Sequence, residues 1–202
     1  MEGLVLIILI VLSLIAIGAT IVYLLNYIGY FYRVRVFTGP SIVSEMKVAY
    51  KYCVGNYNAC GSYFSEAANI CPDERLLGIY YDDPKKVDPN QCRYIVGIIL
   101  AEGSKAKEEV NEEVEGILEE RGYKFIIFPN VDFSVKTSHP YAIPMSAYFG
   151  ATKAYPAMET YIQREKLCAR PFLEIYDENT IHYMAPLSKQ VEFYTDEVKD
   201  LR

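Results

Sequence analysis

A continuous apolar run near the amino terminus constrains this chain more than any other feature. Residues 4–25 (LVLIILIVLSLIAIGATIVYLL) are almost wholly aliphatic, and no charged residue occurs from Gly3 to Tyr32. At about 1.5 Å per residue, a helix of this length crosses a hydrocarbon core of about 30 Å. The sequence therefore predicts one transmembrane helix that runs from Leu4 to Leu25.

A cleaved signal peptide is the competing interpretation of this run. Such a peptide needs a basic start, an apolar stretch of about 7 to 15 residues and a small-residue cleavage site. In this chain Glu2 precedes a longer run, and nothing resembling that site follows it. Aromatic residues up to Tyr32 are typical of the headgroup level of a bilayer. We therefore expect residues 1–32 to remain as a membrane anchor with an aromatic belt.

The orientation of the anchor follows from its flanking charges. Arg33 and Arg35 lie just beyond the belt, whereas the amino-terminal amine is balanced by Glu2. Basic residues favour the cytosolic side, so we expect a luminal amino terminus and a cytosolic domain. Five cysteines without paired spacing and the lack of an Asn-x-Ser/Thr sequon also suit a reducing compartment.

Composition and spacing exclude several function classes. The net charge is -6, and Lys and Arg form no basic run, so we expect no direct nucleic-acid binding. The transmembrane helix makes the lipid bilayer an expected partner. The two histidines, His139 and His182, lie in separate predicted strands, which favours packing or hydrogen bonding over metal binding. We expect no metal and no cofactor.

Residues 46–187 repeat one order of elements, between a linker at 33–45 and a polar carboxy-terminal segment at 188–202. Apolar periodicity and turn residues predict strands at 46–55, 75–82, 92–102 and 131–141, helices at 57–70 and 143–167, and a hairpin within 170–187. An acidic helix at 107–122 and a strand at 123–129 separate the halves. Two strand-helix-strand-strand units can join into one antiparallel sheet with helices on one face. The sequence therefore predicts an α+β domain.

The apolar residues of the second long helix form a periodic stripe. They are Met145, Phe149, Thr152, Tyr155, Met158 and Ile162. We expect this stripe to face the sheet and Pro156 to kink or split the helix.

The stretch RPFLEIYDENTIHYMAPL, residues 170–187, places a carboxylate among aromatic rings. Phe172, Glu174 and Tyr176 share one face of the first strand because side chains alternate. A three-residue turn would place His182 roughly opposite Glu174, although the register could slip by one residue. We expect these rings on the sheet face opposite the helices, and candidate ligand-binding residues are Glu174, Tyr176, Phe172, Tyr50, Tyr80 and His182.

Two interpretations of Glu174 remain open. As a scaffold residue, it accepts hydrogen bonds from tyrosine hydroxyls or from His182 and holds the inner face in order, which is the interpretation we favour. As a pocket residue, it combines with ring faces to attract a cation. The assignment of Tyr50 and Tyr80 to this face depends on registers that the sequence leaves open.

The repeated element order, the loop YYDDPKKVDPNQCRY (80–94) and the stretch FLEIY (172–176) resemble the GyrI-like domain of bacterial multidrug regulators. The resemblance implies a glutamate at the base of an aromatic pocket that attracts cationic ligands. Some GyrI-like proteins are hydrolases that open strained cyclopropane rings, and Glu174 and Tyr176 would then be the catalytic residues. We expect no enzymatic activity, with this hydrolase as the alternative.

The motifs VAYKY, YYDDP, QCRYIVGIILAEG, ETYIQREKLCARPFLEIY and IHYMAPL, behind a membrane helix, resemble the testis-expressed protein 264 family. The resemblance implies a single-pass protein of the endoplasmic reticulum membrane with a cytosolic GyrI-like domain. It also implies an adaptor or receptor in selective autophagy of the reticulum. Cytosolic partners would include autophagy modifiers and the valosin-containing ATPase.

Receptors of that family carry a disordered acidic tail with a docking motif, an aromatic residue three positions before an aliphatic one. The stretches 123–126 (YKFI) and 172–175 (FLEI) fit this spacing, but both lie in predicted strands. We therefore expect the docking motif to be absent from this chain. Whether a tail follows Arg202 remains open.

Overall fold

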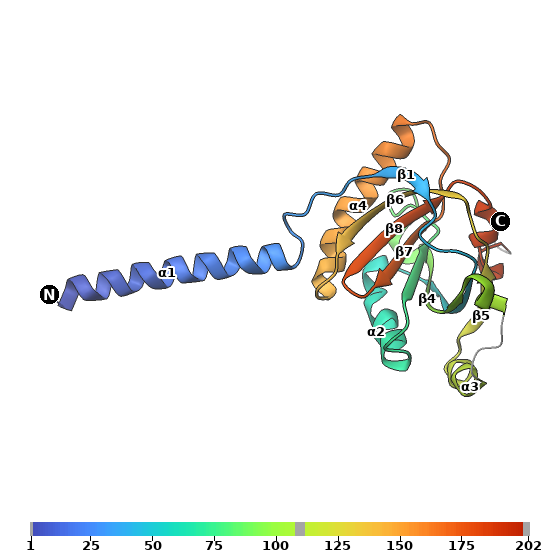
Figure 1. Cartoon of the computed structure of the whole chain (residues 1–202), viewed down its shortest axis with the longest axis horizontal. Helices are drawn as coiled ribbons and strands as arrows, with labels where there is room; N and C mark the ends of the chain where they lie inside the picture. Colours follow the sequence, from blue (N-terminus) through green and yellow to red (C-terminus); the bar gives the residue numbers. More distant parts are fainter. Residues whose placement is uncertain (1, 108–111, 200–202) are drawn as a thin grey trace.

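The computed structural model describes residues 2–107 and 112–199, and Figure 1 shows a long helix that projects from one α+β domain. The helix, α1, spans Glu2–Tyr27 and has no buried residue. Its 26 residues are about 39 Å long at about 1.5 Å per residue. In the described chain it alone is long and apolar enough to cross a membrane. No part of the domain covers its apolar surface.

The two polar side chains in the middle of α1 are satisfied within the helix. The hydroxyls of Ser13 and Thr20 each donate a 2.9 Å hydrogen bond to the carbonyl four residues earlier. Neither hydroxyl donor is therefore left unpaired. The helix ends just before Gly29, whose φ of 80° is the left-handed conformation that glycine tolerates at a helix terminus.

The domain is built on one antiparallel sheet with the strand order β1-β6-β8-β7-β3-β4-β2-β5. The strands are β1 (Phe37–Pro40), β2 (Met46–Val54), β3 (Leu76–Tyr80), β4 (Arg93–Glu102), β5 (Lys124–Phe128), β6 (Phe133–Pro140), β7 (Phe172–Asp177) and β8 (Thr180–Pro186). The halves meet where β3 pairs with β7, each strand being antiparallel to the other. The predicted α+β fold, with two units joined into one sheet, is confirmed.

Three helices pack on one face of the sheet. They are α2 (Gly61–Ile70), α3 (Glu112–Glu120) and α4 (Pro144–Arg164). Ala67 of α2 and Leu118 of α3 are fully buried in the same cluster, and Met158 of α4 is fully buried in the neighbouring one. The helix expected at 107–122 is described only from Glu112, because residues 108–111 lie outside the described ranges.

The linker expected at 33–45 contains an edge strand. Residues 37–40, which form β1, pair with β6 in the register Phe37↔Lys136 to Pro40↔Phe133. The unpaired edge of β6 offers backbone groups for such pairing, and proline is tolerated on an edge strand. Gly39 and Pro40 are therefore part of the sheet.

The segment after residue 187 is part of the fold rather than a polar appendage. It forms a short 3-10 turn, η4 (Gln190–Phe193), and a one-turn helix, α5 (Asp196–Lys199). Phe193 and Val198 are completely buried on the sheet face opposite the long helices, in the cluster that includes Leu77. The mostly polar composition of residues 188–202 did not reveal this packing, because a few apolar residues are enough to cover the sheet face. Residues 200–202 lie outside the described chain.

The buried stripe of α4 differs from the predicted one. Small residues face the sheet, namely Ser146, Gly150 and Ala154, together with Met158. A Cβ on Gly150 would lie 2.4 Å from the Tyr183 hydroxyl, so the helix approaches the sheet too closely for larger side chains. Met145, which the sequence placed in the stripe, is 57% exposed. Pro156 lies inside α4 without ending it.

Candidate functional site

Glu174 lies at the centre of the sheet, in β7, between its register partners Gly78 of β3 and Tyr183 of β8. Its face of the sheet is the one that α2 and α4 cover, because Tyr155 of α4 contacts its carboxylate. The expectation that the aromatic face lies opposite the helices is therefore wrong. Figure 1 shows α2 and α4 at this domain face, and a groove lined by residues of both helices includes Glu174.

Three tyrosine hydroxyls donate hydrogen bonds to the Glu174 carboxylate. Tyr155 donates to Oε1 at 2.6 Å, whereas Tyr176 and Tyr80 donate to Oε2 at 2.9 Å and 3.1 Å. Glu174 itself is only 4% exposed. A buried carboxylate is stable only with such partners, so the three rings and the acid form one hydrogen-bonded unit, the Glu174 cluster.

Protonation in this cluster follows from its burial. Desolvation raises the pKa of Glu174, although the hydrogen bonds from the three tyrosines act in the opposite direction. Desolvation, followed by the nearby carboxylate, raises the pKa of Tyr80, Tyr155 and Tyr176 well above the ordinary value. The hydroxyls therefore keep their protons and remain donors at neutral pH.

Gly78 gives the cluster its space. A Cβ at this position would lie 3.0 Å from the Phe64 ring and 3.1 Å from the Tyr80 hydroxyl. The missing side chain thus lets rings from α2 and β3 lie over the sheet next to the carboxylate. Phe64 also contacts Tyr176, with ring centroids 4.7 Å apart.

The predicted pairing of His182 with Glu174 is wrong by one residue. The hairpin turns through two residues, Glu178 and Asn179, since Asp177 pairs with Thr180. Glu178 takes a φ of 42°, as tight two-residue turns require. Tyr183 is therefore opposite Glu174, and His182 points to the other face beside Ile175.

Tyr50 also lies outside the cluster. It belongs to the core on the opposite face of the sheet, with Leu77 and Ile79. Its hydroxyl lies 3.3 Å from Oε2 of Glu197, to which it donates, and burial followed by this carboxylate raises its pKa. Tyr80, Phe172 and Tyr176 are the aromatic candidates that the structure does bring together around Glu174.

A groove of about 840 Å³ lies above the Glu174 cluster, between α2 and α4. Its floor is formed by Tyr80, Phe172, Glu174 and Tyr176, and its walls include Phe64, Ser65 and Ala68 of α2 and Ala147, Tyr148 and Ala151 of α4. Apart from the carboxylate, the central lining is mostly aromatic and aliphatic. A groove of this size fits a drug-sized apolar molecule.

Two residues of the site were missed by sequence reasoning. Tyr155 was interpreted as part of an apolar stripe, although its hydroxyl makes the shortest hydrogen bond to Glu174. Cys60 lines the groove with its sulfur 3.7 Å from the Tyr80 hydroxyl, and burial raises its pKa to about 11. Cys60 is thus a neutral thiol at physiological pH, which does not favour nucleophilic chemistry.

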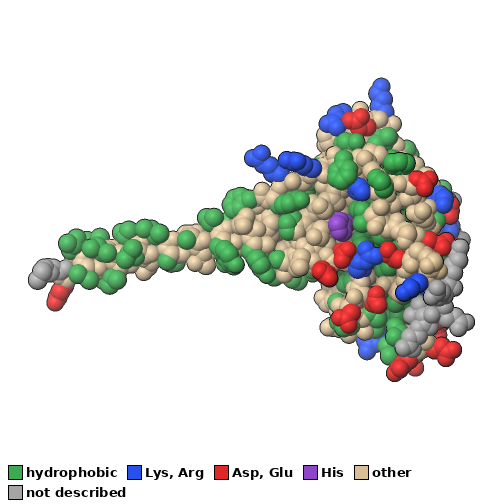
Figure 2. All heavy atoms as spheres, in the orientation of Figure 1, with side chains coloured by type: hydrophobic (Ala, Val, Ile, Leu, Met, Phe, Trp, Pro, Cys, Tyr) green, Lys and Arg blue, Asp and Glu red, His purple; other side chains and the backbone are tan. Residues whose placement is uncertain are grey.

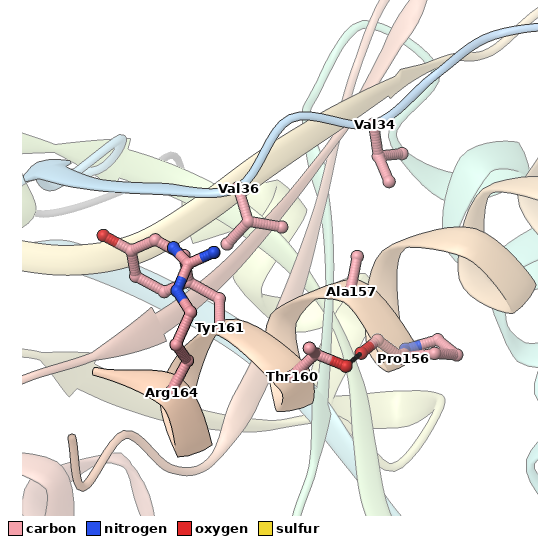
Figure 3. Close-up of a pocket in the computed structure, with 7 residues that line it drawn as sticks. All are labelled: Val34, Val36, Pro156, Ala157, Thr160, Tyr161 and Arg164. Atoms are coloured by element: carbon pink, nitrogen blue, oxygen red, sulfur yellow. Dashed lines mark hydrogen bonds between the residues drawn. The ribbon is translucent and has the colours of Figure 1, made fainter. Parts of the chain in front are cut away.

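A second hollow, of about 420 Å³, lies between the linker and the far half of α4 (Figure 3). Val34 and Val36 face Ala157 across it, and Thr160 donates its hydroxyl to the Pro156 carbonyl at 2.8 Å. Arg164 covers the Tyr161 ring, with 5.2 Å between the guanidinium carbon and the ring centroid. No set of polar groups converges in this hollow, so we interpret it as the place where the linker packs against α4 rather than as a binding site.

Metal ligands are not grouped in the described residues. Within 2–107 and 112–199, no three His, Cys, Asp or Glu side chains are placed to hold a metal ion. The five cysteines are free thiols, and Cys168 is the exposed one. His139 packs against the end of α1 instead, with Nε2 3.1 Å from the carbonyl oxygen of Gly29.

Comparison with known proteins identifies two curated relatives. The chain is 39% identical over 175 residues to testis-expressed protein 264 homolog of Mus musculus. The aligned region covers 87% of this chain and 56% of the mouse protein. It is 38% identical over 175 residues to testis-expressed protein 264 of Homo sapiens, and that alignment covers 87% of this chain and 55% of the human protein. The chain therefore spans about half the length of these relatives. No protein-family model matches it.

Solved structures show distant likenesses. The EcmrR C-terminal domain has a TM-score of 0.48 at 13% identity and covers 78% of this chain and 98% of its own. An uncharacterized conserved protein from Listeria innocua has a TM-score of 0.45 at 15% identity, with 77% and 92% covered. A hydrolase from the same organism has a TM-score of 0.42 at 15% identity, with 79% and 95% covered.

Proposed function

Because this chain belongs to the testis-expressed protein 264 family over the 175 residues that it shares with its relatives, we propose that it is a membrane-anchored adaptor of the endoplasmic reticulum. In this proposal α1 holds it in the reticulum membrane with the domain in the cytosol, where it acts in selective autophagy of that membrane. The observation that carries the proposal is the family match of a chain whose 26-residue apolar helix no protein surface covers.

The proposed partners are cytosolic proteins, including autophagy modifiers and the valosin-containing ATPase. The stretches 123–126 and 172–175, which have docking-motif spacing, do not present their aromatic residues for such contacts. Tyr123 and Phe172 are each only 4% exposed, and Ile175 is completely buried. Engagement of autophagy modifiers would therefore use a segment other than these strands.

The test is turnover of reticulum membrane in starved cells. Cells that lack the protein receive its complete coding sequence, and lysosome-dependent loss of a reticulum marker is measured. The wild-type protein is expected to restore turnover, whereas Leu12→Arg with Ile15→Arg is not. Each charge at the middle of a membrane helix costs about 2.5 to 3.5 kcal/mol of insertion free energy.

The matched control is Leu12→Ile with Ile15→Leu, which keeps α1 apolar and is expected to restore turnover fully. Turnover that is the same with and without the protein would refute the proposed role. Turnover that the arginine variant restores would refute the need for the anchor.

A second function is favoured by the groove above the Glu174 cluster. We propose that the groove is a sensor site that binds a small aromatic cation. The Glu174 carboxylate already accepts three hydrogen bonds, so its charge attracts a cation from a distance more readily than it attacks an electrophile. This arrangement favours binding over the hydrolase alternative.

Thermal shifts test this second function. Aromatic cations and their neutral analogues are added to the chain in detergent micelles, and the cations are expected to raise its melting temperature more. Ala151→Phe fills the groove and is expected to abolish the shift, whereas Val191→Phe, at a 63% exposed position of η4 away from the groove lining, is expected to keep it. No shift with any compound would rule out a sensor for this class.

A further inference from the structure

The end of α1 is tied to the domain by a cation and a ring. The Nζ atom of Lys153 in α4 donates hydrogen bonds to the carbonyls of Gly29 at 3.0 Å and Tyr32 at 3.1 Å, and also to that of Tyr30. His139 of β6 lies against the same Gly29 carbonyl. These contacts bind the segment that directly follows α1 to β6 and α4. They also fix which side of the domain adjoins the carboxy-terminal end of α1.

A row of aromatic rings leads from that end onto the start of α4. Ring centroids are 5.2 Å apart for Phe31 and Tyr30, 5.4 Å for Tyr30 and Phe149, and 5.7 Å for Phe149 and Tyr148. Met145 lies about one helical turn before Tyr148 in α4. Met145 and the outer rings of the row are exposed to solvent. Tyr148 is 62% exposed, Met145 57% and Phe31 54%.

We propose that the first turns of α4, from residue 144 to 149, rest on the bilayer surface, with Met145 and Tyr148 at headgroup depth. The proposal rests on the proposed membrane insertion of α1. If α1 spans the bilayer, Tyr30 and Phe31 lie at the level of the headgroups, where aromatic side chains are favoured. The ring contacts then hold α4 at that level. Figure 1 shows that the start of α4 lies beside the carboxy-terminal end of α1.

Lipid is the occupant that this surface fits, because the patch continues the apolar surface of the anchor. Figure 2 shows hydrophobic side chains gathered where α1 meets the domain, with Lys and Arg side chains nearby. Arg33 and Arg35 are both exposed in the connecting segment. Their charge favours anionic headgroups, as in other surface-bound segments. Tyr148 also lines the groove, which would then open beside the bilayer.

Tryptophan fluorescence provides the test, since the chain contains no tryptophan. Three full-length proteins, Tyr148→Trp, Val191→Trp and Leu12→Trp, are reconstituted in phosphatidylcholine–phosphatidylserine vesicles. Bromine is placed either near the headgroup or near the end of the acyl chain. Each protein then reports on one depth, because bromine quenches only nearby indoles.

The proposal predicts that lipids brominated near the headgroup quench Tyr148→Trp and that its emission shifts to the blue. Neither lipid should quench Val191→Trp, whose position is 63% exposed in η4. Lipids brominated at the chain end should quench Leu12→Trp. Adding Met145→Glu to Tyr148→Trp should reduce its quenching, whereas Met145→Leu should not.

Failure of the anchor and failure of the surface contact give different results. If Leu12→Trp is not quenched, α1 does not enter the bilayer, and both this inference and the proposed membrane anchoring are overturned. If Leu12→Trp is quenched and Tyr148→Trp is not, only the surface contact is overturned. A blue shift of Tyr148→Trp without quenching, dependent on protein concentration, would instead assign the patch to a second copy of the chain.

Discussion

Tyr155 of α4 donates a 2.6 Å hydrogen bond to Glu174 of β7, which joins the middle of the longest helix of the domain to the centre of the sheet. The acid is buried, and the two other donors, Tyr80 and Tyr176, come from the sheet itself. The helix thus supplies one donor and the sheet two. We infer that the Glu174 cluster both supports the fold and shapes the floor of the groove.

Replacing the acid tests its structural role. Glu174→Leu leaves three tyrosine donors without their acceptor, and each buried unsatisfied donor costs about 1 to 3 kcal/mol. We expect it to lower the free energy of unfolding of the chain in detergent micelles by more than Glu174→Gln does, because glutamine retains one acceptor oxygen. Denaturant titrations followed by near-ultraviolet circular dichroism measure both losses.

Glu192→Gln, at an exposed position of η4, is the control for the removal of a negative charge. It is expected to leave the free energy of unfolding nearly unchanged. A gain of stability in Glu174→Gln would contradict the scaffold interpretation. It would indicate that the carboxylate is kept for binding at the expense of stability.

The raised pKa of Glu174 predicts a pH dependence with a definite sign. A carboxyl whose pKa is higher in the folded than in the unfolded state binds its proton more tightly when folded, so its stabilisation is lost as pH rises. The stability advantage of wild type over Glu174→Gln is therefore expected to shrink from pH 4.5 upwards through the folded pKa. Unfolding titrations at a series of pH values would contradict this if the difference were constant or grew.

The hydrogen bond from α4 can be removed alone. Tyr155→Phe keeps the ring contacts with Phe172 and Tyr183 but loses the donor to a charged acceptor, which is worth about 1.5 to 3 kcal/mol. We expect a loss of unfolding free energy in that range. Tyr148→Phe, on the exposed side of the same helix, is the matched control and is expected to change stability little. Equal effects of the two changes would contradict the role assigned to Tyr155.

Membrane topology gives the fourth prediction. Lys85→Asn with Val87→Thr creates a glycosylation sequon in the loop between β3 and β4, where Lys85 is exposed. With the domain in the cytosol this site is expected to stay unglycosylated in microsomes, whereas a sequon in an added amino-terminal tag is expected to be glycosylated. Protease added to sealed microsomes should digest the domain. Glycosylation at residue 85 would reverse the orientation.

Much of the fold could be read from local patterns. Alternation in β2 and β7 predicted these strands, and the repeated order of elements predicted that the strands form one sheet. The resemblance of FLEIY placed Glu174 at the centre of the candidate site, and the structure locates it there. The strand predictions depend only on spacing within the chain, whereas the place of Glu174 in a pocket is what the family resemblance implies.

The inferences that failed depended on a single residue of register or on packing between elements. A turn of two residues instead of three put Tyr183, not His182, opposite Glu174, since a shift by one residue moves a side chain to the other face. The period of α4 could not show that Gly150 and its small neighbours face the sheet, because close approach of a helix favours small residues over apolar ones. Tyr155 was thus assigned to packing alone.

The sequence by itself determined the membrane-length helix, because the apolar run at residues 4–25 is a local pattern that does not depend on the domain. It also determined the class of the domain, through strand periods that are local. Only the tertiary structure decided which rings share the Glu174 carboxylate and where α1 meets α4. Such contacts join residues such as Tyr80 and Glu174, which are 94 positions apart in the chain. Their meeting depends on the pairing of β3 with β7 and on the distance of each helix from the sheet, which no local pattern encodes.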